Sequence, residues 1–452
     1  MHARWSMAAG CCMQTRDGEP IRVVYPGIAA GSSGPDYKDA VVTFDGSGTV
    51  RGDVELHLHG DDWRRHGHDT DAAYDGVVLH VVAEPRSLSR TRTAGGRDVP
   101  VVVLGDADCL PLQPELPCAQ RAGRDIEFVR TVLMRAGIAW LLSRAARIGA
   151  RTTELEPWKL LGHLSARALG YSANAEASLA LGRRLTDAGV LALLRQDHYD
   201  ARSALVMGIA GLLPSQRTGA DMRTDAEASQ WESAWSRQAS GVPSMRSSSW
   251  RLSGLYPNNS PVRRTSALAG LLLHMEMLAD AAPGLVVQHG ERPRRCAALL
   301  EQHYRVAGDA YWRRHYDFGL RTRESDVIGV SKAREMVVNA LLPWVAAGAL
   351  MSGDATCLAA TVQLLCRYPA APAHSVTRHM QRQLGFVRGC GSAGVQQGML
   401  HVFREHCRRG LCASCPLGVE GVWPASRGWS PATNGQAAMA SCSRPDDIMS
   451  GQ

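Results

Sequence analysis

The chain has 452 residues, of which 45% are hydrophobic and 21% charged, and these values exclude a disordered or fibrous protein. Its length is enough for two to three domains, each with a core of its own. The formal net charge is +7, and lysine occurs only at Lys38, Lys159 and Lys332 beside 47 arginines; a GC-rich genome would explain this bias, as would recognition of phosphate or carboxylate groups.

The first part of the chain has the pattern of a β-rich domain. After a start at 1–14 that we expect to be flexible, residues 15–112 contain short β-branched runs separated by Gly, Asp and Pro. These predicted strands are 21–25, 40–44, 54–59, 77–82 and 99–104. The sequence Asp-Gly-Ser-Gly at 45–48 predicts a hairpin turn between the second and the third of them.

From about residue 121 the hydrophobic residues recur with a helical period, and we expect residues 113–416 to form a larger, all-helical region. The clearest helical runs are 125–148, 176–194, 266–279, 296–306, 331–350 and 396–408. Residues 217–251 and 256–261 are expected to be loops. Residues 417–452 are rich in Gly, Pro, Ser and Ala without a period, and they predict a disordered tail. The expected fold class is therefore α+β.

We expect a cytoplasmic protein that does not enter a membrane. The first fifteen residues contain no apolar stretch long enough for a secretion signal. The longest uncharged run, residues 336–353, carries Asn339 and Pro343 and is shorter than the roughly 20 apolar residues that a spanning helix needs. This run is better explained as a buried core helix. Twelve cysteines without a signal favour a reducing compartment, where they would be thiols or metal ligands.

The predicted strand at 53–59 alternates strictly between polar and apolar residues. One face carries Asp53, Glu55, His57 and His59, and the other carries Val54, Leu56 and Leu58. A solvated face of an antiparallel sheet would explain the alternation. Carboxylates and imidazoles together are, however, residue types that bind metals and transfer protons.

Further histidines follow the same strand. His66 and His68 come within eleven residues of His57, and His80 lies inside the otherwise apolar run 77–82. A buried histidine such as His80 is either a core hydrogen-bonding group or a metal ligand, and the pattern leaves both open.

A Pro-Asp pair, Pro35-Asp36, stands just before the 40–44 strand. A Pro-Asp ahead of a hairpin, with a carboxylate two residues before a basic group on the returning strand, resembles the core of PD-(D/E)xK nucleases, which have a restriction-endonuclease-like fold. The resemblance implies that Asp36 and Glu55 hold Mg²⁺ or Mn²⁺, which activates water against a phosphodiester. His57 replaces the usual lysine and, being mostly neutral near pH 7, would act as a base or a ligand.

Three cysteines are packed into nine residues near the end of the helical region, at Cys407, Cys412 and Cys415. A Cys-x-x-Cys pair followed by proline is common at zinc and iron–sulfur sites. We therefore expect zinc or a [4Fe–4S] cluster here, with scattered buried thiols as the simpler alternative. A closed site needs a fourth ligand, for which Cys390 is the nearest cysteine. The other candidates are Cys366, His401 and His406.

Seven stretches form a specific combination over nearly the whole chain: 15–27, 34–40, 52–69, 73–82, 258–264, 396–403 and 407–416. Together they resemble a bacterial family catalogued as domain of unknown function 2851. That family has no established activity, so the resemblance implies no function. This chain departs from the family pattern at 29–31, where an asparagine is usual, and at Tyr256, where an arginine is usual.

These features favour a metal-dependent nuclease or related phosphodiester hydrolase. Its catalytic residues would be Asp36, Glu55 and His57, with further metal ligands among His59, His66 and His68. Arg263 and Arg264 follow a loop framed by two prolines and would bind a substrate phosphate bidentately.

Two alternatives remain. The first is a non-catalytic nucleic-acid or protein-binding module, held together by zinc or an iron–sulfur cluster, in which the histidines form a structural network. The second is a histidine-ligated zinc or iron hydrolase. The sequence does not indicate an oligomeric state.

Overall fold

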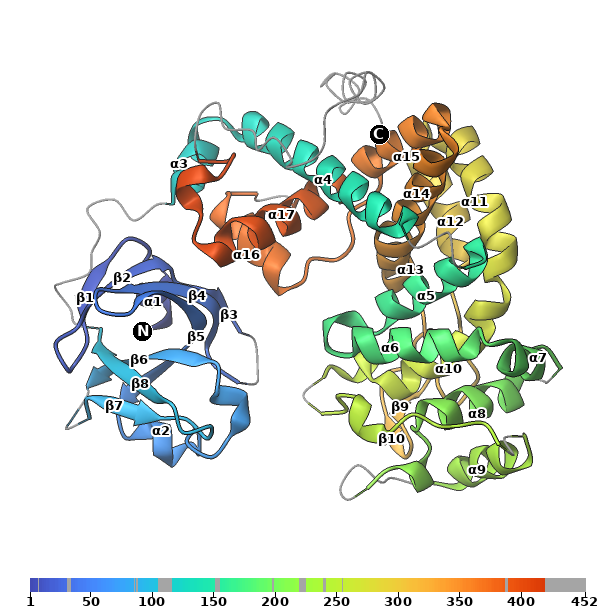
Figure 1. Cartoon of the computed structure of the whole chain (residues 1–452), viewed down its shortest axis with the longest axis horizontal. Coiled ribbons are helices and arrows are strands. Elements are labelled where there is room, and N and C mark those ends of the chain that lie inside the picture. Colours follow the sequence, from blue (N-terminus) through green and yellow to red (C-terminus); the bar gives the residue numbers. More distant parts are fainter. Residues whose placement is uncertain are drawn as a thin grey trace. The chain divides into compact units, whose positions relative to one another are not determined.

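The computed structural model describes residues 1–6, 8–30, 34–84, 86, 88–104, 116–150, 155–196, 199–218, 225–238, 241–253, 255–386 and 389–418. The described chain forms two compact units (Figure 1). Among the described residues, the first contains Met1–Gly137 and residues 372–418, and the second contains Ile138–Ala371. The expected α+β class is confirmed. The helical region is not one body, however, because its last part returns to the unit that contains the sheet.

The first unit is built on a mixed sheet with the strand order β1-β2-β4-β5-β6-β8-β7, in which β3 pairs with β4. The strands are β1 (Cys12–Gln14), β2 (Pro20–Tyr25), β3 (Ile28–Ala29), β4 (Tyr37–Phe44), β5 (Gly48–His59), β6 (Val77–Glu84), β7 (Arg90–Arg92) and β8 (Asp98–Val103). Each of the five predicted strands is present, and the predicted hairpin joins β4 to β5 with Phe44 opposite Gly48.

The strands in the middle of the sheet are buried on both faces. β4 and β5 are antiparallel, whereas β5 runs parallel to β6 and β6 parallel to β8. Parallel strands are usually covered on both sides, and the continuous apolar run of β6 agrees with this rule. The alternation predicted for β5 is only partly correct. Val54 and Leu56 belong to the hydrophobic core of the sheet. Leu56 is the last residue of β5 in that core, and Leu58 is 63% exposed.

Residues 1–14 were expected to be flexible, but their described part, residues 1–6 and 8–14, is packed on the sheet. A short helix, α1 (His2–Ser6), buries the whole side chain of Trp5, whose Nε1 donates a hydrogen bond of 2.9 Å to the carbonyl of Pro26. Burial of one tryptophan removes a large apolar area from water. This single side chain explains why the segment is ordered.

The remaining elements of the first unit are helical. They are α2 (Asp62–Arg65), α3 (Pro117–Arg124), the first half of α4 (Ile126–Gly149), α16 (Ser375–Gln383) and α17 (Ala393–Glu405), with short turns at Ala72–Tyr74, Cys407–Arg409 and Cys412–Ser414. Figure 1 shows α4 beside α17, and their backbones touch through glycines. A Cβ added at Gly398 would lie 1.8 Å from the carbonyl oxygen of Leu133, and one at Gly137 would lie 2.1 Å from that of Gly394.

The second unit is helical, with a small hairpin of β9 (His315–Asp317) and β10 (Leu320–Arg321). Its helices are α5 (Pro157–Leu169), α6 (Tyr171–Leu185), α7 (Ala188–Gln196), α8 (Tyr199–Ala210), α9 (Ala226–Gln238), α10 (Pro261–Leu273), α11 (Met275–His289), α12 (Pro293–Gln302), α13 (Val330–Met336), α14 (Leu342–Ser352) and α15 (Ala355–Arg367). α9 lies inside the segment expected to be a loop. Its Trp231 is buried and packs edge-on against Trp312, an interaction between distant segments.

The most apolar segment is a continuous helix, Val330–Ser352, which comprises α13, a π-helical turn and α14. It is long and apolar enough to cross a membrane, but 67% of its most apolar window is buried within the protein. The bent pair of α10 and α11 meets the same test only if it is counted as one span. Core helices of soluble proteins have these properties too, which agrees with the buried core helix that we expected. The cytoplasmic location stays a prediction.

We predict that Gly398→Ala destabilises the first unit, because the added methyl group would push the backbone of α17 away from that of α4. The expected loss is at least about 1–3 kcal/mol of unfolding free energy, measured by chemical denaturation. Gly123→Ala in α3 is the matched control, since a Cβ there meets nothing within 4 Å. The control should be neutral or stabilising by up to about 1 kcal/mol. Equal stability of the two variants would contradict the close helix contact.

A second prediction concerns the stability of the helical unit in acid. His163 on α5 is buried and bonded through Nε2 to the Thr186 hydroxyl at 2.7 Å. Burial, with smaller contributions from nearby Arg183 and Lys159, lowers the pKa of His163 to about 4. Between about pH 6.5 and 4, His163 is protonated in the unfolded chain but stays neutral in the folded protein. The free energy of unfolding should therefore fall as the pH is lowered through this range.

His163→Gln removes this titration and keeps a hydrogen-bonding side chain. The variant should lose less stability than the parent over that pH range, by up to about 3 kcal/mol, in denaturation curves recorded at several pH values. Parallel pH profiles of the two proteins would show that His163 is not held neutral by the fold.

Candidate functional site

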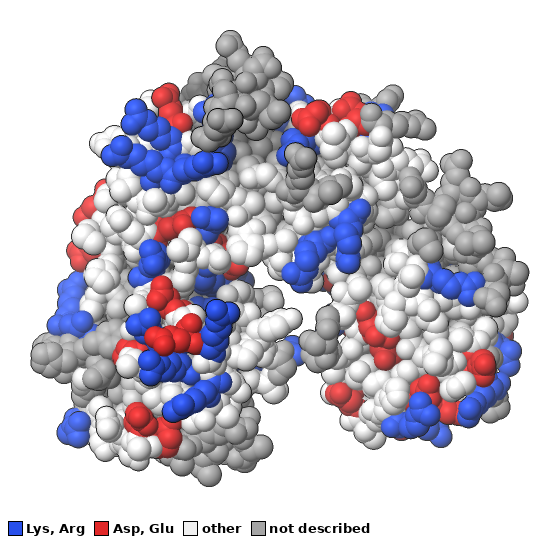
Figure 2. Space-filling view, turned by 180° about the vertical axis from the view of Figure 1, so that it is seen from behind, with Lys and Arg blue, Asp and Glu red and all other residues white. Residues whose placement is uncertain are grey.

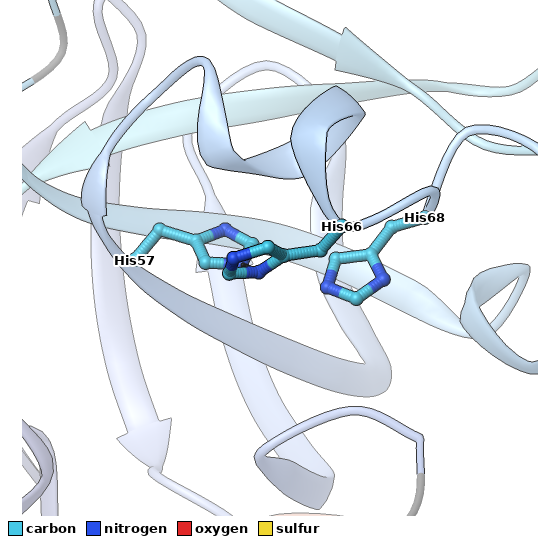
Figure 3. Close-up of side chains that lie close together, drawn as sticks. All are labelled: His57, His66 and His68. Atoms are coloured by element: carbon cyan, nitrogen blue, oxygen red, sulfur yellow. Dashed lines mark hydrogen bonds between the residues drawn. The ribbon is translucent and has the colours of Figure 1, made fainter.

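Three histidines converge beside the carboxyl end of β5. His57 lies on β5 itself, and His66 and His68 lie on the turn that follows α2 (Figure 3). One nitrogen of each ring lies within 4.8 Å of the other two. His57 Nε2 and His66 Nδ1 are 3.1 Å apart. The rings of His57 and His68 are buried, whereas His66 is exposed, so the group is accessible from one side.

A pair of carboxylates adjoins the three rings. Glu55 Oε1 lies 3.3 Å from His68 Nε2 and 3.5 Å from His57 Nε2. The backbone N–H of Asp36 donates to Glu55 Oε2 at 2.9 Å, and the backbone N–H of Leu56 donates to Asp36 Oδ2 at 3.0 Å. These two reciprocal bonds tie the start of β4 to the end of β5. The structure therefore brings Asp36 and Glu55 together with the three histidines.

His59, which we expected among the metal ligands, lies outside this group. It is opposite Glu84 in the pairing of β5 with β6, and its Nδ1 is 3.3 Å from Glu84 Oε2. Its backbone N–H donates to Asp62 Oδ2 at 3.2 Å. The side chain of His59 is thus engaged at the edge of the sheet, although it shares the alternation of His57.

Other ring side chains pack against the buried histidines of this group. His80 on β6 is fully buried, and its Nε2 lies 2.9 Å from Nδ1 of His57, so it is a hydrogen-bonding partner of that ring. Tyr74 stacks on His68 with ring centroids 3.7 Å apart. Trp63 packs against both His68 and His80 and donates from Nε1 to the Arg92 carbonyl. Packing on several sides fixes the orientation of the rings.

Burial sets the protonation of the group. It lowers the pKa of His57 to about 4, with further repulsion from His68 and His66, and it lowers the pKa of His80 to about 3. The pKa of Glu55 is raised to about 8, first by burial and then by the negative charge of Asp36. Near neutral pH the buried imidazoles are therefore uncharged, with lone pairs free to bind a cation, and Glu55 is close to its titration point.

The donors that converge differ from the oxygen ligands expected for Mg²⁺. Three imidazole nitrogens meet, with one carboxylate oxygen of Glu55 beside them, whereas the Asp36 carboxylate accepts from Leu56. Imidazole suits Zn²⁺ and other transition metals, while Mg²⁺ prefers oxygen. The group could hold a metal ion, and its donor chemistry is that of a transition-metal site.

A second cluster gathers cysteines in the first unit. One cavity is lined by Cys118, Cys407, Cys412 and Cys415, together with Tyr25, Gln383 and His406. The structure places Cys118, and not the expected Cys390, beside the other three cysteines. Cys390 does not line this cavity, and its carbonyl accepts a hydrogen bond of 3.5 Å from Arg130 Nη1. Cys118 was missed because it lies on α3, far away in the sequence, where no spacing connects it to the others.

Arg263 and Arg264, expected to clamp a phosphate, are buried in the second unit. Arg263 on α10 is completely inaccessible and donates to the carbonyls of Trp312 at 2.9 Å and Ser325 at 2.7 Å. Arg264 donates to the carbonyl of Val327. Both guanidinium groups thus satisfy backbone carbonyls inside the unit, and the phosphate-binding prediction is not supported.

On the face drawn in Figure 2, the described Lys and Arg side chains are interspersed with Asp and Glu. Several arginines are paired, such as Arg313 and Arg314 with Glu324. Binding of nucleic acid therefore stays a prediction.

Comparisons with known proteins give a family without a function. No curated protein and no solved structure matches the chain. A family model described as "Protein of unknown function (DUF2851)" matches residues 5–372. The matched range contains the sheet and the histidine group, and it ends before Cys407, Cys412 and Cys415. As the resembling stretches predicted, the chain belongs to the DUF2851 family.

Proposed function

We propose that the first unit is a metal-dependent hydrolase and that His57, His66 and His68 hold its cation. The convergence of three ring nitrogens within 4.8 Å carries this proposal, because three protein ligands leave a coordination position open for water or substrate. When bound, such a cation activates water as a nucleophile near neutral pH and polarises the bond under attack.

Glu55 is the residue best placed to move protons in this site. One carboxylate oxygen faces His57 and His68, while the other is held by the N–H of Asp36. Its raised pKa, about 8, allows it both to accept and to release a proton near neutral pH. Asp36 contributes twice, since its backbone orients Glu55 and its charge raises the pKa of Glu55.

His80 acts as a positioning residue. A cation at Nε2 of His57 requires the ring proton on Nδ1, and His80 Nε2 lies 2.9 Å away, where it can accept that proton in a hydrogen bond. Partners of this kind fix the tautomer and direction of metal-binding histidines. Because His80 is fully buried between apolar residues of β6, the partner cannot swing away.

A phosphodiester is the substrate class that the surroundings favour. Arg64 and Arg65 are exposed and directly precede the exposed ligand His66; Arg65 is paired with Asp62, so the charge of Arg64 borders the open side of the site. The hairpin that carries Asp36 and Glu55 also resembles the core of PD-(D/E)xK nucleases. The alternative of a non-catalytic binding module is separated from this proposal by experiment.

The first test is metal binding. We expect the purified protein to retain about one Zn²⁺ or Mn²⁺ per chain after dialysis, measured by elemental analysis, and His66→Ala to weaken binding by at least about 10–100-fold in calorimetric titrations. His66 is exposed, so its removal should leave the fold intact. His59→Ala is the matched control and should bind like the parent. Equal binding by both variants and the parent would refute the three-histidine site.

The second test is catalysis. Glu55→Gln should keep the fold and lower metal-stimulated hydrolysis by about 100-fold or more, as removal of a general base does. The assay measures cleavage of an activated phosphodiester and of labelled single- and double-stranded oligonucleotides. Glu84→Gln, an exposed carboxylate on neighbouring β6, is the control. A metal-loaded parent protein that binds oligonucleotides without cleaving any substrate would favour the binding module.

A further inference from the structure

Four cysteines from two distant segments of the chain surround one cavity in the first unit. Cys118 is near the start of α3, and Cys407, Cys412 and Cys415 lie on the two short turns after α17. Gln383 Nε2 approaches the Cys118 sulfur to 3.1 Å. Three of the four thiols are buried, and the ten cysteines in the described part of the chain form no disulfide.

The spacing of the sulfurs bears on what they bind. Among the described residues, three ligand atoms within 4.8 Å of one another occur at the histidine group and not among these cysteines. A single tetrahedral ion, with metal–sulfur bonds of about 2.3 Å, would hold its sulfurs only roughly 4 Å apart. In an iron–sulfur cluster each thiolate binds a different iron, so the sulfurs are spread more widely. The wider arrangement around a common cavity therefore fits a cluster.

These thiols are not isolated core residues, because they lie around the same cavity. Four sulfurs from two distant segments share one cavity, and Cys118, Cys407 and Cys415 are buried there. Each thiol loses its proton when its sulfur binds a metal. The positively charged irons of a cluster would stabilise the thiolates in this dry environment.

The same loop is attached to the strand that begins beside the histidine group. Arg408, between two of the cysteines, donates to Asp39 at 2.7 Å, and the Asp39 N–H donates to Asp53 at 3.2 Å. Asp39 has a φ of 60°, at the point where β4 shifts register against β5. Gly410 also has a positive φ, and a Cβ there would lie 3.0 Å from Val41 on β4. The cysteine loop thus packs on an irregular part of β4, three residues from Asp36.

We propose that Cys118, Cys407, Cys412 and Cys415 ligate a [4Fe–4S] cluster, which fastens the chain on either side of the second unit to the sheet. The cluster joins Cys118, which precedes the second unit in the sequence, to three cysteines that follow that unit. Its role is structural: it holds the loop that buttresses β4. The inference does not depend on the hydrolase proposal, because its evidence is a separate set of residues.

The full chain is purified without oxygen, or reconstituted with ferric iron, sulfide and a thiol reductant. We expect about four irons and four acid-labile sulfides per chain, with broad visible absorbance. Cys118→Ser should lose most of the iron, the sulfide and the absorbance. Cys390→Ser is the matched control, a buried thiol of the same unit outside the cavity, and it should retain all three.

Labile sulfide distinguishes the cluster from iron bound at the histidines, and His66→Ala should leave it unchanged. If Cys118→Ser is insoluble, the half-buried Cys412→Ser takes its place and should likewise lose sulfide together with thermal stability. One zinc per chain without sulfide would overturn the cluster. Loss of sulfide in Cys390→Ser but not in Cys118→Ser would overturn the ligand assignment. A protein that binds neither zinc nor iron would overturn both the cluster and its ligand assignment.

Discussion

The burial of polar side chains in the middle strand of the sheet is the constraint on which the rest of the first unit depends. β5 pairs with antiparallel β4 on one side and with parallel β6 on the other, so Glu55 and His57 are only 6% exposed each. Buried polar groups cost free energy unless they are hydrogen-bonded. The surrounding segments supply the partners: Asp36 from the start of β4, His66 and His68 from the turn after β5, and His80 from β6. The site is thus the means by which a polar strand is accommodated inside a sheet.

This constraint also determines the chemistry. A buried group titrates away from its charged form, so the imidazoles become neutral donors and Glu55 keeps its proton to higher pH. Neutral nitrogen donors held in one place suit a cation. A cation would in turn favour the ionised form of Glu55, which burial and the charge of Asp36 otherwise disfavour. The same burial that disfavours charge on single residues therefore favours a bound metal.

The two candidate metal centres differ in how the chain assembles them. The three histidines lie within twelve consecutive residues, so a strand and the turn after it are enough to bring them together. The cysteines come from segments on either side of the second unit, because Cys118 precedes Ile138–Ala371 and Cys407 follows it. Such a closure removes more conformational freedom from the unfolded chain than a local one, so stabilisation by a bound cluster would be correspondingly large. A metal site formed by neighbouring residues suits catalysis, whereas a metal site formed by distant segments suits a structural role that links those segments.

The sequence by itself determined the strands, the β4–β5 hairpin and the local part of the histidine group, since strand periodicity, turn residues and short spacings are properties of neighbouring residues. It also indicated that Asp36 and Glu55 meet, because a hairpin places its two ends side by side. Only the tertiary structure decided that Trp5 anchors the N-terminus, that Arg263 and Arg264 are buried, and that Cys118 lies beside Cys407, Cys412 and Cys415. Each of these depends on which distant segment covers a residue. No local period encodes that, because it follows from the packing of the whole unit.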